Sequence, residues 1–200
     1  PEHRAEVARL WGVPAVPERP GKTAVEMFDA IASGEIRMVW IACTNPAQSM
    51  PDAGAVRRAL QRAELVVVQD ACRDTDTADY ADILLPASTW AEKEGTVTNS
   101  ERRITRVRAA VPPPGTARHD WEIAVDFAHR LGARLAGADA GRLFPYRSAE
   151  EVFDEHRRTT AGRDLDISGM SYAMLETQGP QQWPLPQDAD RGCARLYADG

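Results

Sequence analysis

Residues 37–88 read RMVWIACTNPAQSMPDAGAVRRALQRAELVVVQDACRDTDTADYADILLPAS, and this stretch decides the fold. It holds three short apolar runs that each stop at small polar or acidic residues: Met38–Ala42, Leu65–Val68 and Ile83–Leu85. Apolar runs of this length are typical of parallel strands that are covered on both faces. The carboxyl ends of such strands meet at one edge of a sheet, and ligands of open α/β folds bind at that edge.

Helical patterns alternate with these strands. Thr23 is suited to cap a helix over Ala24–Ala32, with Gly34 as its stop. Pro51 is suited to the first turn of a helix that runs to Ala63. Strand–helix–strand alternation predicts a parallel sheet. The expected fold class is therefore α/β: a three-layer, Rossmann-like parallel sheet with helices on both faces, followed by an irregular C-terminal extension.

The second half of the chain is less regular. Residues 104–109 alternate apolar with polar side chains, as a half-exposed strand does, and Asp120 is suited to cap a helix over Trp121–Leu131. Ser148 and Glu151 form a capping box that opens a helix to about Arg158. We therefore expect an α/β cofactor-binding domain over residues 1–135 and a helical or irregular extension over residues 136–200.

Composition excludes several classes of protein. The chain has 43% apolar and 27% charged residues, a net charge of −6 and a pI near 5.3. This balance argues against a surface for nucleic acid or for anionic membranes. No apolar run approaches the roughly 20 residues that a membrane span needs. We expect no nucleic-acid partner and no membrane span.

The cysteines and the chain ends suggest the setting. Cys43, Cys72 and Cys193 show no spacing of a zinc site or a disulfide framework. No metal ligand is therefore expected, and a reducing, cytoplasmic location is the natural interpretation. The chain starts with Pro1 and stops at RLYADG, so we expect it to be a piece of a longer protein.

Standard nucleotide-binding motifs are missing, because there is neither a GxGxxG nor a GxxxxGK[ST]. The polar strand ends must then carry any binding function. Asp70 follows a Val-Val-Val run and could accept hydrogen bonds from a ribose hydroxyl or a guanine edge. It could equally be a helix cap or a solvated loop acid. Thr44 and Asn45 could bind a ligand or simply form the turn that Asn-Pro favours.

The charged and titratable residues leave similar alternatives. Lys93 could neutralise a phosphate, although a solvated charge in a Glu-Lys-Glu run is the favoured interpretation. Arg102 and Arg103 could bind an anion or form ion pairs with acidic side chains of a neighbouring segment. The histidines are scattered, and none stands near a Ser or Cys in the sequence: His3, His119, His129 and His156. We expect no catalytic residue in this chain.

One long run adds a family resemblance. Val66–Ile123 contains the series D–T–A–D–LPA–W–EK–GT–TN–ERR, and it resembles the molybdopterin oxidoreductase family. Formate dehydrogenases share the block EKEGTVTNSERR. Three other segments look more like assimilatory nitrate reductases: Trp40–Ala53, Phe144–Tyr172 and Gly179–Pro186.

The resemblance implies a cofactor and a set of residues that bind it. In this family a molybdenum ion is held by a pair of molybdopterin guanine dinucleotides. Positions matching the family's dinucleotide contacts are Thr44, Asn45, Gln69, Asp70, Lys93 and Asp120. The resemblance also places Asn99, Arg102 and Arg103 either at the cofactor or at a contact with a neighbouring domain.

The resemblance further implies a function for the longer protein. The chain would be the guanine-dinucleotide-binding part of a molybdenum-dependent nitrate reductase that reduces nitrate to nitrite. It would be inactive alone, because the iron–sulfur cluster and any molybdenum ligand belong to a preceding segment. Its partners would be the remaining domains of the same polypeptide and an electron-donor protein or domain. The alternatives are a segment of a formate dehydrogenase alpha subunit and a molybdenum-free scaffold domain of a complex I-type subunit.

Overall fold

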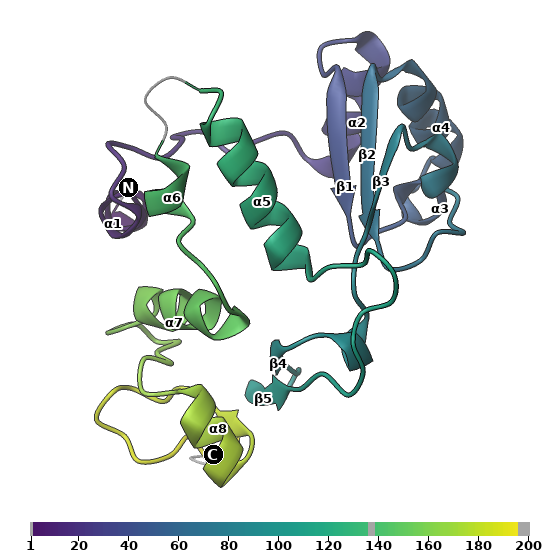
Figure 1. Ribbon diagram of the computed structural model, residues 1–200. Helices are drawn as coiled ribbons and strands as arrows, with labels where there is room; N and C mark the ends of the chain where they lie inside the picture. Colours follow the sequence, from purple (N-terminus) through teal and green to yellow (C-terminus); the bar gives the residue numbers. More distant parts are fainter. Residues whose placement is uncertain (1, 136–138, 196–200) are drawn as a thin grey trace. The chain divides into compact units, whose positions relative to one another are not determined.

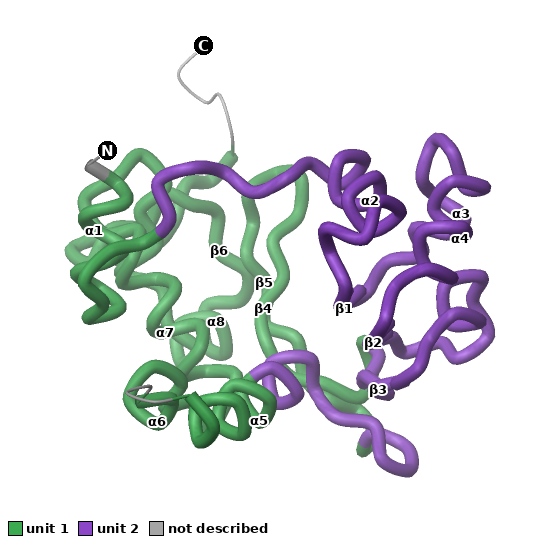
Figure 2. Tube along the Cα trace, turned by 90° about the horizontal axis from the view of Figure 1, so that it is seen from above, with its two compact units in different colours: residues 1–16, 90–112, 125–200 green, residues 17–89, 113–124 purple. Residues whose placement is uncertain are grey.

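A computed structural model describes residues 2–135 and 139–195 (Figure 1). The chain divides into two compact units, which Figure 2 draws in different colours. The unit that we call the sheet unit contains residues 17–89 and 113–124. The unit that we call the hairpin unit contains residues 1–16, 90–112 and 125–200. Each unit is therefore assembled from separate stretches of sequence.

The sheet unit is built on the three predicted strands (Figure 1). They are β1 (Met38–Ala42), β2 (Leu65–Asp70) and β3 (Ile83–Pro86), in the order β1-β2-β3. Both pairs are parallel, so β2 is the central strand. This confirms the α/β class and the parallel sheet. Two further elements of this unit are α3 (Pro46–Ser49) and the 3-10 turn η1 (Ala78–Tyr80).

The two long helices of the sheet unit begin and end at capping residues. Helix α2 (Ala24–Ser33) starts with the predicted Thr23, which forms a capping box with Glu26, and it ends at Gly34 with a φ of 84°. Helix α4 (Ala53–Arg62) is capped by Asp52, whose carboxylate accepts a hydrogen bond from the amide of Ala55. The expected start at Pro51 was wrong, because the Asp52 side chain caps the helix one residue later.

Helices α2 and α4 pack against the same face of the sheet. Alternate strand residues point toward them, because successive side chains of a strand face opposite ways. The buried cluster is Phe28, Ile31, Val39, Ile41, Ala47, Val56, Ala59, Leu60, Val66 and Val68. The coarser expectation of a parallel sheet with packed helices is confirmed. The expected placement of helices on opposite faces does not apply to this pair.

The hairpin unit contains a second sheet. Strands β4 (Gly95–Thr98) and β5 (Arg103–Val107) are antiparallel, and β6 (Gln181–Gln182) pairs antiparallel with β5. The alternating pattern of residues 104–109 predicted β5, whereas no strand was expected at the position of β4. The connecting turn is held by Asn99, whose Oδ1 accepts from the amides of Glu101 and Arg103 at 3.0 Å each.

The hairpin unit has a second hydrophobic core and several helices. They are α1 (Glu2–Trp11), the 3-10 turn η2 (Trp90–Glu92), α6 (Ala140–Leu143), α7 (Ala149–Thr159) and α8 (Tyr172–Gln178). Helix α5 (Asp120–Gly132) starts in the sheet unit and runs into the hairpin unit. The second core consists of Ile104, Phe153, Ile167, Met170, Tyr172, Leu175 and Leu185. Residues of the predicted extension therefore pack with β5; the domain boundary at residue 135 stays a prediction.

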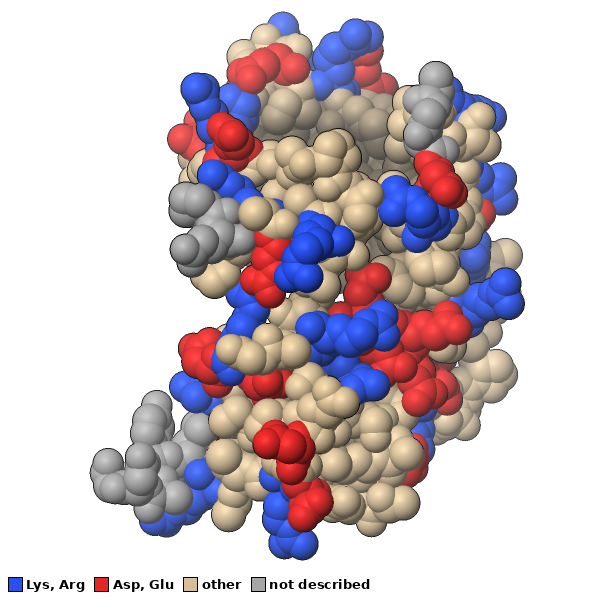
Figure 3. All heavy atoms as spheres, turned by 90° about the vertical axis from the view of Figure 1, so that its left-hand side faces the viewer, with Lys and Arg blue, Asp and Glu red and all other residues tan. Residues whose placement is uncertain are grey.

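Charged side chains of both signs are interspersed on the face that Figure 3 presents. Several of the charged residues of the chain form ion pairs, such as Arg37 with Glu64 at 2.6 Å and Arg57 with Asp76 at 2.9 Å. Exposed pairs of this kind contribute little stability. Among the described helices, none has the length and apolar character needed to cross a membrane.

Candidate functional site

The residues that follow the three parallel strands lie along one edge of the sheet unit. Ala42 stands opposite Gln69 in the β1–β2 register, and Asp70 stands opposite Pro86 in the β2–β3 register. The amide of Cys43 donates to the carbonyl of Gln69 at 2.9 Å, so the pairing continues past the end of β1. The structure therefore brings the predicted strand ends side by side.

Asp120 joins this edge from much later in the chain. Its Oδ1 accepts a hydrogen bond from Nε2 of Gln69 at 2.9 Å, across 51 residues of sequence. The same oxygen accepts from Sγ of Cys43 at 3.3 Å. Gln69 is only 4% exposed, and a buried amide with a hydrogen-bond partner has a fixed orientation. Two of the predicted binding residues are therefore in direct contact, and the carboxylate faces donors from the ends of both β1 and β2.

Asp70 is half-buried at the end of β2. Its Oδ1 accepts a hydrogen bond from the amide of Cys72 at 2.8 Å, which is the Asx turn that an aspartate forms with its own backbone. Its other oxygen has no hydrogen-bond partner among residues 2–135 and 139–195. The residue therefore shapes the turn and still offers one acceptor to a ligand.

Asn45 holds the loops after β1 and β2 together. Its Oδ1 accepts from the amide of Thr77 at 3.1 Å and from the hydroxyl of Thr77 at 2.6 Å. Its Nδ2 donates to Gln48, and the Thr77 hydroxyl accepts from the amide of Ala47 at 3.1 Å. Thr77 is completely buried. These contacts support the interpretation of Asn45 as a turn former. The neighbouring Thr44 is exposed.

The turn between β1 and this loop has an unusual backbone. Cys43 has a φ of 58°, in the left-handed region that residues other than glycine seldom adopt. Such residues cluster at functional sites, where the surrounding contacts maintain the strain. Here the amide and the thiol of Cys43 both have partners, Gln69 and Asp120. Nothing in the sequence indicated this conformation, because glycine and asparagine are the residues that usually do so.

A serine–histidine contact lies at the same edge. Ser88 is 2% exposed and directly follows the Ala87 that ends the third strand region. Its Oγ lies 2.9 Å from Nδ1 of His119, which is 31 residues away in sequence. No histidine stands near a serine in the sequence, so this contact between distant residues was not expected. The pair could have been sought from its place in the fold, because Ser88 follows strand β3 and His119 precedes helix α5.

Lys93 belongs to the other compact unit, the hairpin unit. Its Nζ lies 5.4 Å from the centroid of the Trp90 ring, within the range of a cation–π contact. Trp90 is 64% exposed. The remaining predicted binding residues are all in the sheet unit. The role of Lys93 in binding phosphate therefore stays a prediction.

The other predicted positions of the hairpin unit have contacts within that unit. Arg102 lies over the Trp183 ring, 4.8 Å from its centroid. The Arg103 guanidinium donates to the carbonyl of Pro180 at 3.3 Å. Asn99 holds the β4–β5 turn. Arg102 and Arg103 therefore connect the hairpin to the C-terminal segment, whereas Asn99 acts within the hairpin turn.

A metal centre is not evident in the described part of the chain. Across residues 2–135 and 139–195, no three His, Cys, Asp or Glu side chains are grouped as metal ligands. No disulfide joins the cysteines there either. The carboxyl edge of the sheet is therefore the candidate site: a surface with carboxylate, amide and hydroxyl groups.

The chain is similar in sequence to a family of known proteins. A family model described as molybdopterin oxidoreductase matches residues 2–130. The assimilatory nitrate reductase catalytic subunit of Bacillus subtilis is 42% identical over 200 residues, which cover 99% of this chain and 27% of that protein. A nitrate reductase of Synechocystis is 42% identical over 205 residues, covering 100% of this chain and 28% of that protein. The chain thus spans about a quarter of the length of these relatives.

The fold also has a counterpart among solved structures. Acetylene hydratase from Pelobacter acetylenicus superposes with a TM-score of 0.63 over 92% of this chain and 24% of that chain. The sequence identity of the pair is 20%. At this identity the likeness concerns the fold alone.

Proposed function

The chain belongs to the molybdopterin oxidoreductase family, and from that premise we propose that the carboxyl edge of its parallel sheet binds the nucleotide part of a molybdopterin guanine dinucleotide. Membership agrees with the resemblance of Val66–Ile123 and implies a molybdenum–pterin cofactor. The observation that carries the proposal is the contact between Gln69 and Asp120 at the edge where β1 and β2 end.

The polar groups of this edge fit a guanine nucleotide. Guanine presents two adjacent N–H donors, and ribose presents hydroxyl donors. Ionised carboxylates are acceptor-only groups that can receive two donors at once. Asp70 has one oxygen without a protein partner among the described residues, and Asp120 is held in place by a buried amide. Both residues would hold the base or the ribose.

The phosphates require a different partner. A lysine supplies a compact positive charge for phosphate oxygens, so Lys93 would contact the diphosphate. Thr44 has an exposed hydroxyl beside the same strand end, and it would donate to a phosphate or sugar oxygen. Asn45 would keep the loop that carries Thr44 in place through its contacts with Thr77.

The proposal extends to the longer enzyme. Relatives with 42% identity are named nitrate reductases, which favours nitrate over formate as the substrate. When bound, bis-molybdopterin guanine dinucleotide with molybdenum supplies the redox chemistry that removes an oxygen atom from nitrate to give nitrite. This chain's residues would bind and orient the nucleotide end of that cofactor, so the chain would have no activity by itself.

The remaining features of the longer enzyme follow from the same proposal. Its iron–sulfur cluster would lie in a different segment and would receive electrons from a donor protein or domain. Other domains of the polypeptide would complete the cofactor site, and the enzyme would be cytoplasmic. Residues 1–135 would then form the nucleotide-binding domain, with a three-layer, Rossmann-like arrangement completed by those neighbours, and residues 136–200 would lead out of it.

Asp70→Asn and Asp120→Asn in the enzyme that carries this chain test the proposal. Each variant replaces an acceptor-only carboxylate by an amide, so molybdenum content and guanine nucleotide released by acid should both fall. Metal analysis and chromatography of the released nucleotide measure the two quantities. Asp79→Asn, at an exposed aspartate of η1, is the matched control. Full cofactor content in both site variants would disprove the assignment of this edge.

A further inference from the structure

The proposed function gives no role to the contact between Ser88 and His119. Ser88 is buried, with 2% of its surface exposed. Its amide donates to the carbonyl of Arg118 at 2.9 Å, and the amide of Arg118 donates to the carbonyl of Pro86 at 3.1 Å. Ala87 and Arg118 form the parallel bridge between the two segments. The segment before α5 is therefore attached to the end of β3 by its backbone.

The side chains add a third connection. Oγ of Ser88 and Nδ1 of His119 are 2.9 Å apart, and the hydroxyl has no other hydrogen-bond partner among the described residues. A buried hydroxyl that failed to donate would carry an unpaired proton, which is costly. The hydroxyl is thus the donor and Nδ1 the acceptor. In the neutral imidazole, the ring proton is therefore on Nε2.

His119 is also fixed by its backbone. Its amide donates to Oε2 of Glu122 at 3.2 Å. Its carbonyl accepts from the amides of Glu122 and Ile123 at 3.0 and 3.1 Å. The residue thus has partners through its amide, its carbonyl and its ring. The next residue, Asp120, extends its carboxylate to Gln69 at 2.9 Å and to Cys43 at 3.3 Å.

We propose that Ser88 and His119 are positioning residues for the nucleotide site: the buried hydroxyl holds the imidazole, and the imidazole fixes the start of α5 so that the Asp120 carboxylate meets Gln69. This inference rests on the proposed function only for the identity of the ligand. The effect of the pair on binding would pass through the backbone that joins His119 to Asp120.

The first test needs no ligand. Long-range ¹H–¹⁵N NMR of the imidazole nitrogens in this chain should show His119 with an unprotonated Nδ1 and a protonated Nε2 at neutral pH. In the Ser88→Ala variant, Nδ1 loses the hydroxyl donor, and the ring should populate both neutral tautomers. A wild-type ring with its proton on Nδ1, or a tautomer that Ser88→Ala leaves unchanged, overturns the proposal. This arm is independent of whether any nucleotide binds.

The second test compares affinities for GDP by calorimetry. Ser88→Ala should weaken binding about tenfold, which is the size of effect that one hydrogen bond carries. His119→Asn should bind like wild type, because its amide oxygen lies as many bonds from the backbone as Nδ1 does. His119→Gln should bind as poorly as Ser88→Ala, because its amide lies one bond further out. Ser33→Ala loses a hydroxyl contact with the Ala30 carbonyl of α2, and as the control it should change nothing.

The third test separates positioning from a general loss of stability. If Ser88 acts through Asp120, then Ser88→Ala should weaken binding in the wild-type background and have no further effect in Asp120→Ala, since coupled sites are not additive. Additive effects of the two changes, or a His119→Gln variant that binds like His119→Asn, overturn the proposal. Absence of GDP binding by the wild-type chain together with the expected tautomer counts against the nucleotide assignment and leaves the Ser88–His119 pair established.

Discussion

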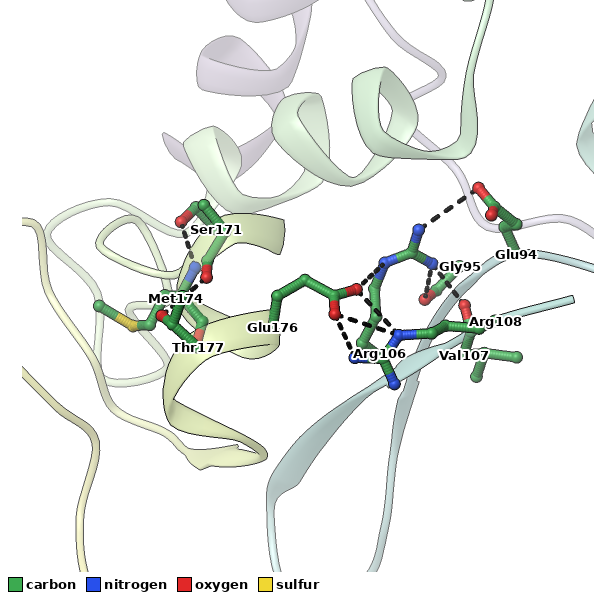
Figure 4. A network of polar contacts seen from close by, with 10 residues as sticks. Glu94, Gly95, Arg106, Val107, Arg108, Ser171, Met174, Glu176 and Thr177 are labelled. Carbon is green, nitrogen blue, oxygen red and sulfur yellow. Dashed lines mark hydrogen bonds and ion pairs between the residues drawn. The ribbon is translucent and has the colours of Figure 1, made fainter.

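The guanidinium carbon of Arg106 lies 3.9 Å from the centroid of the Tyr172 ring. This stacking joins β5 to α8 in the hairpin unit. Arg106 is 10% exposed, donates to the carbonyls of Gly95 and Val107, and pairs with Glu94 at 3.3 Å (Figure 4). A largely buried guanidinium needs such partners for its N–H donors, and these contacts connect Arg106 to its neighbours on β4 and β5.

Arg106→Lys should therefore destabilise the hairpin unit by about 2–3 kcal/mol. Lysine keeps the positive charge but loses the planar fork and the stacking on Tyr172. Urea unfolding followed by circular dichroism measures the change. Arg108→Ala is the matched control, since Arg108 lies just after the same strand and pairs with Glu176 from an exposed position. Equal midpoints for Arg106→Lys and Arg108→Ala would contradict the prediction.

The buried hydroxyl of Thr77 connects two loops at the edge of the sheet. Thr77→Val keeps the shape of the side chain but removes the hydroxyl, leaving the amide of Ala47 without its acceptor. We expect a loss of about 1–3 kcal/mol in the free energy of unfolding, the usual cost of a buried unsatisfied donor. Thr77→Ser keeps the hydroxyl and should recover most of that loss. A serine variant that is no more stable than the valine variant would exclude this role of the hydroxyl.

Gly169 allows two segments of the C-terminal region to approach closely. A Cβ at this position would overlap the carbonyl oxygen of Pro186. Gly169→Ala should therefore destabilise the hairpin unit by about 1–3 kcal/mol through overpacking. Gly21→Ala is the control, because a Cβ there meets nothing within 4 Å. Thermal melting compares the two, and an unchanged midpoint for Gly169→Ala would contradict this close approach of the two backbones.

Asp166 should make stability depend on acid. Burial disfavours the charged form, but hydrogen bonds from Ser168 and Gly162 outweigh burial and hold the pKa of Asp166 below its ordinary value of 3.8. Since the folded-state pKa is the lower one, the carboxylate stabilises the fold above pH 3.8, and this contribution is lost as the pH falls through the folded-state pKa. The stability difference between wild type and Asp166→Asn should shrink on that descent.

Urea unfolding of both proteins at a series of pH values checks this prediction. Asp79→Asn serves as the control, because that aspartate is exposed on the turn η1. A difference between wild type and Asp166→Asn that stays constant down to the most acid pH would show that Asp166 does not contribute in this way.

The sheet unit could be predicted because short stretches of neighbouring residues mark its strands and the ends of its helices. A run such as Val66–Val68 is apolar on both faces, and residues such as Thr23 and Gly34 mark helix ends by side-chain or backbone chemistry alone. The error at Pro51 has a local cause as well. Proline and aspartate both favour helix starts, and here the carboxylate of Asp52 caps the helix by accepting from the amide of Ala55.

The hairpin unit could not be predicted in the same way. Strand β6 consists of Gln181 and Gln182, two polar residues with no strand pattern, and they pair with β5 because of its exposed edge. Arg103 and Gln182 are partners in that register although they lie far apart in sequence. Such pairing depends on tertiary contacts, so the sequence of β6 shows no alternation of apolar and polar residues that would predict a strand.

The candidate site falls between these cases. The ends of β1 and β2 could be placed at one edge from the strand pattern, and Gln69 and Asp70 with them. The family resemblance pointed to Asp120, but no sequence pattern indicated its contact with Gln69. The Ser88–His119 pair was missed because buried polar contacts between distant segments have no spacing rule.

The distance in sequence between Gln69 and Asp120 also sets an order of events during synthesis. The two residues are 51 positions apart, and a ribosome adds about 5–20 residues per second. The last strand of the parallel sheet ends at Pro86, so at this rate the sheet can form roughly 2–7 s before the start of α5 is synthesised. During that interval Gln69 lacks its contact with Asp120, so the edge where we propose that the nucleotide binds stays incomplete until synthesis has passed Asp120.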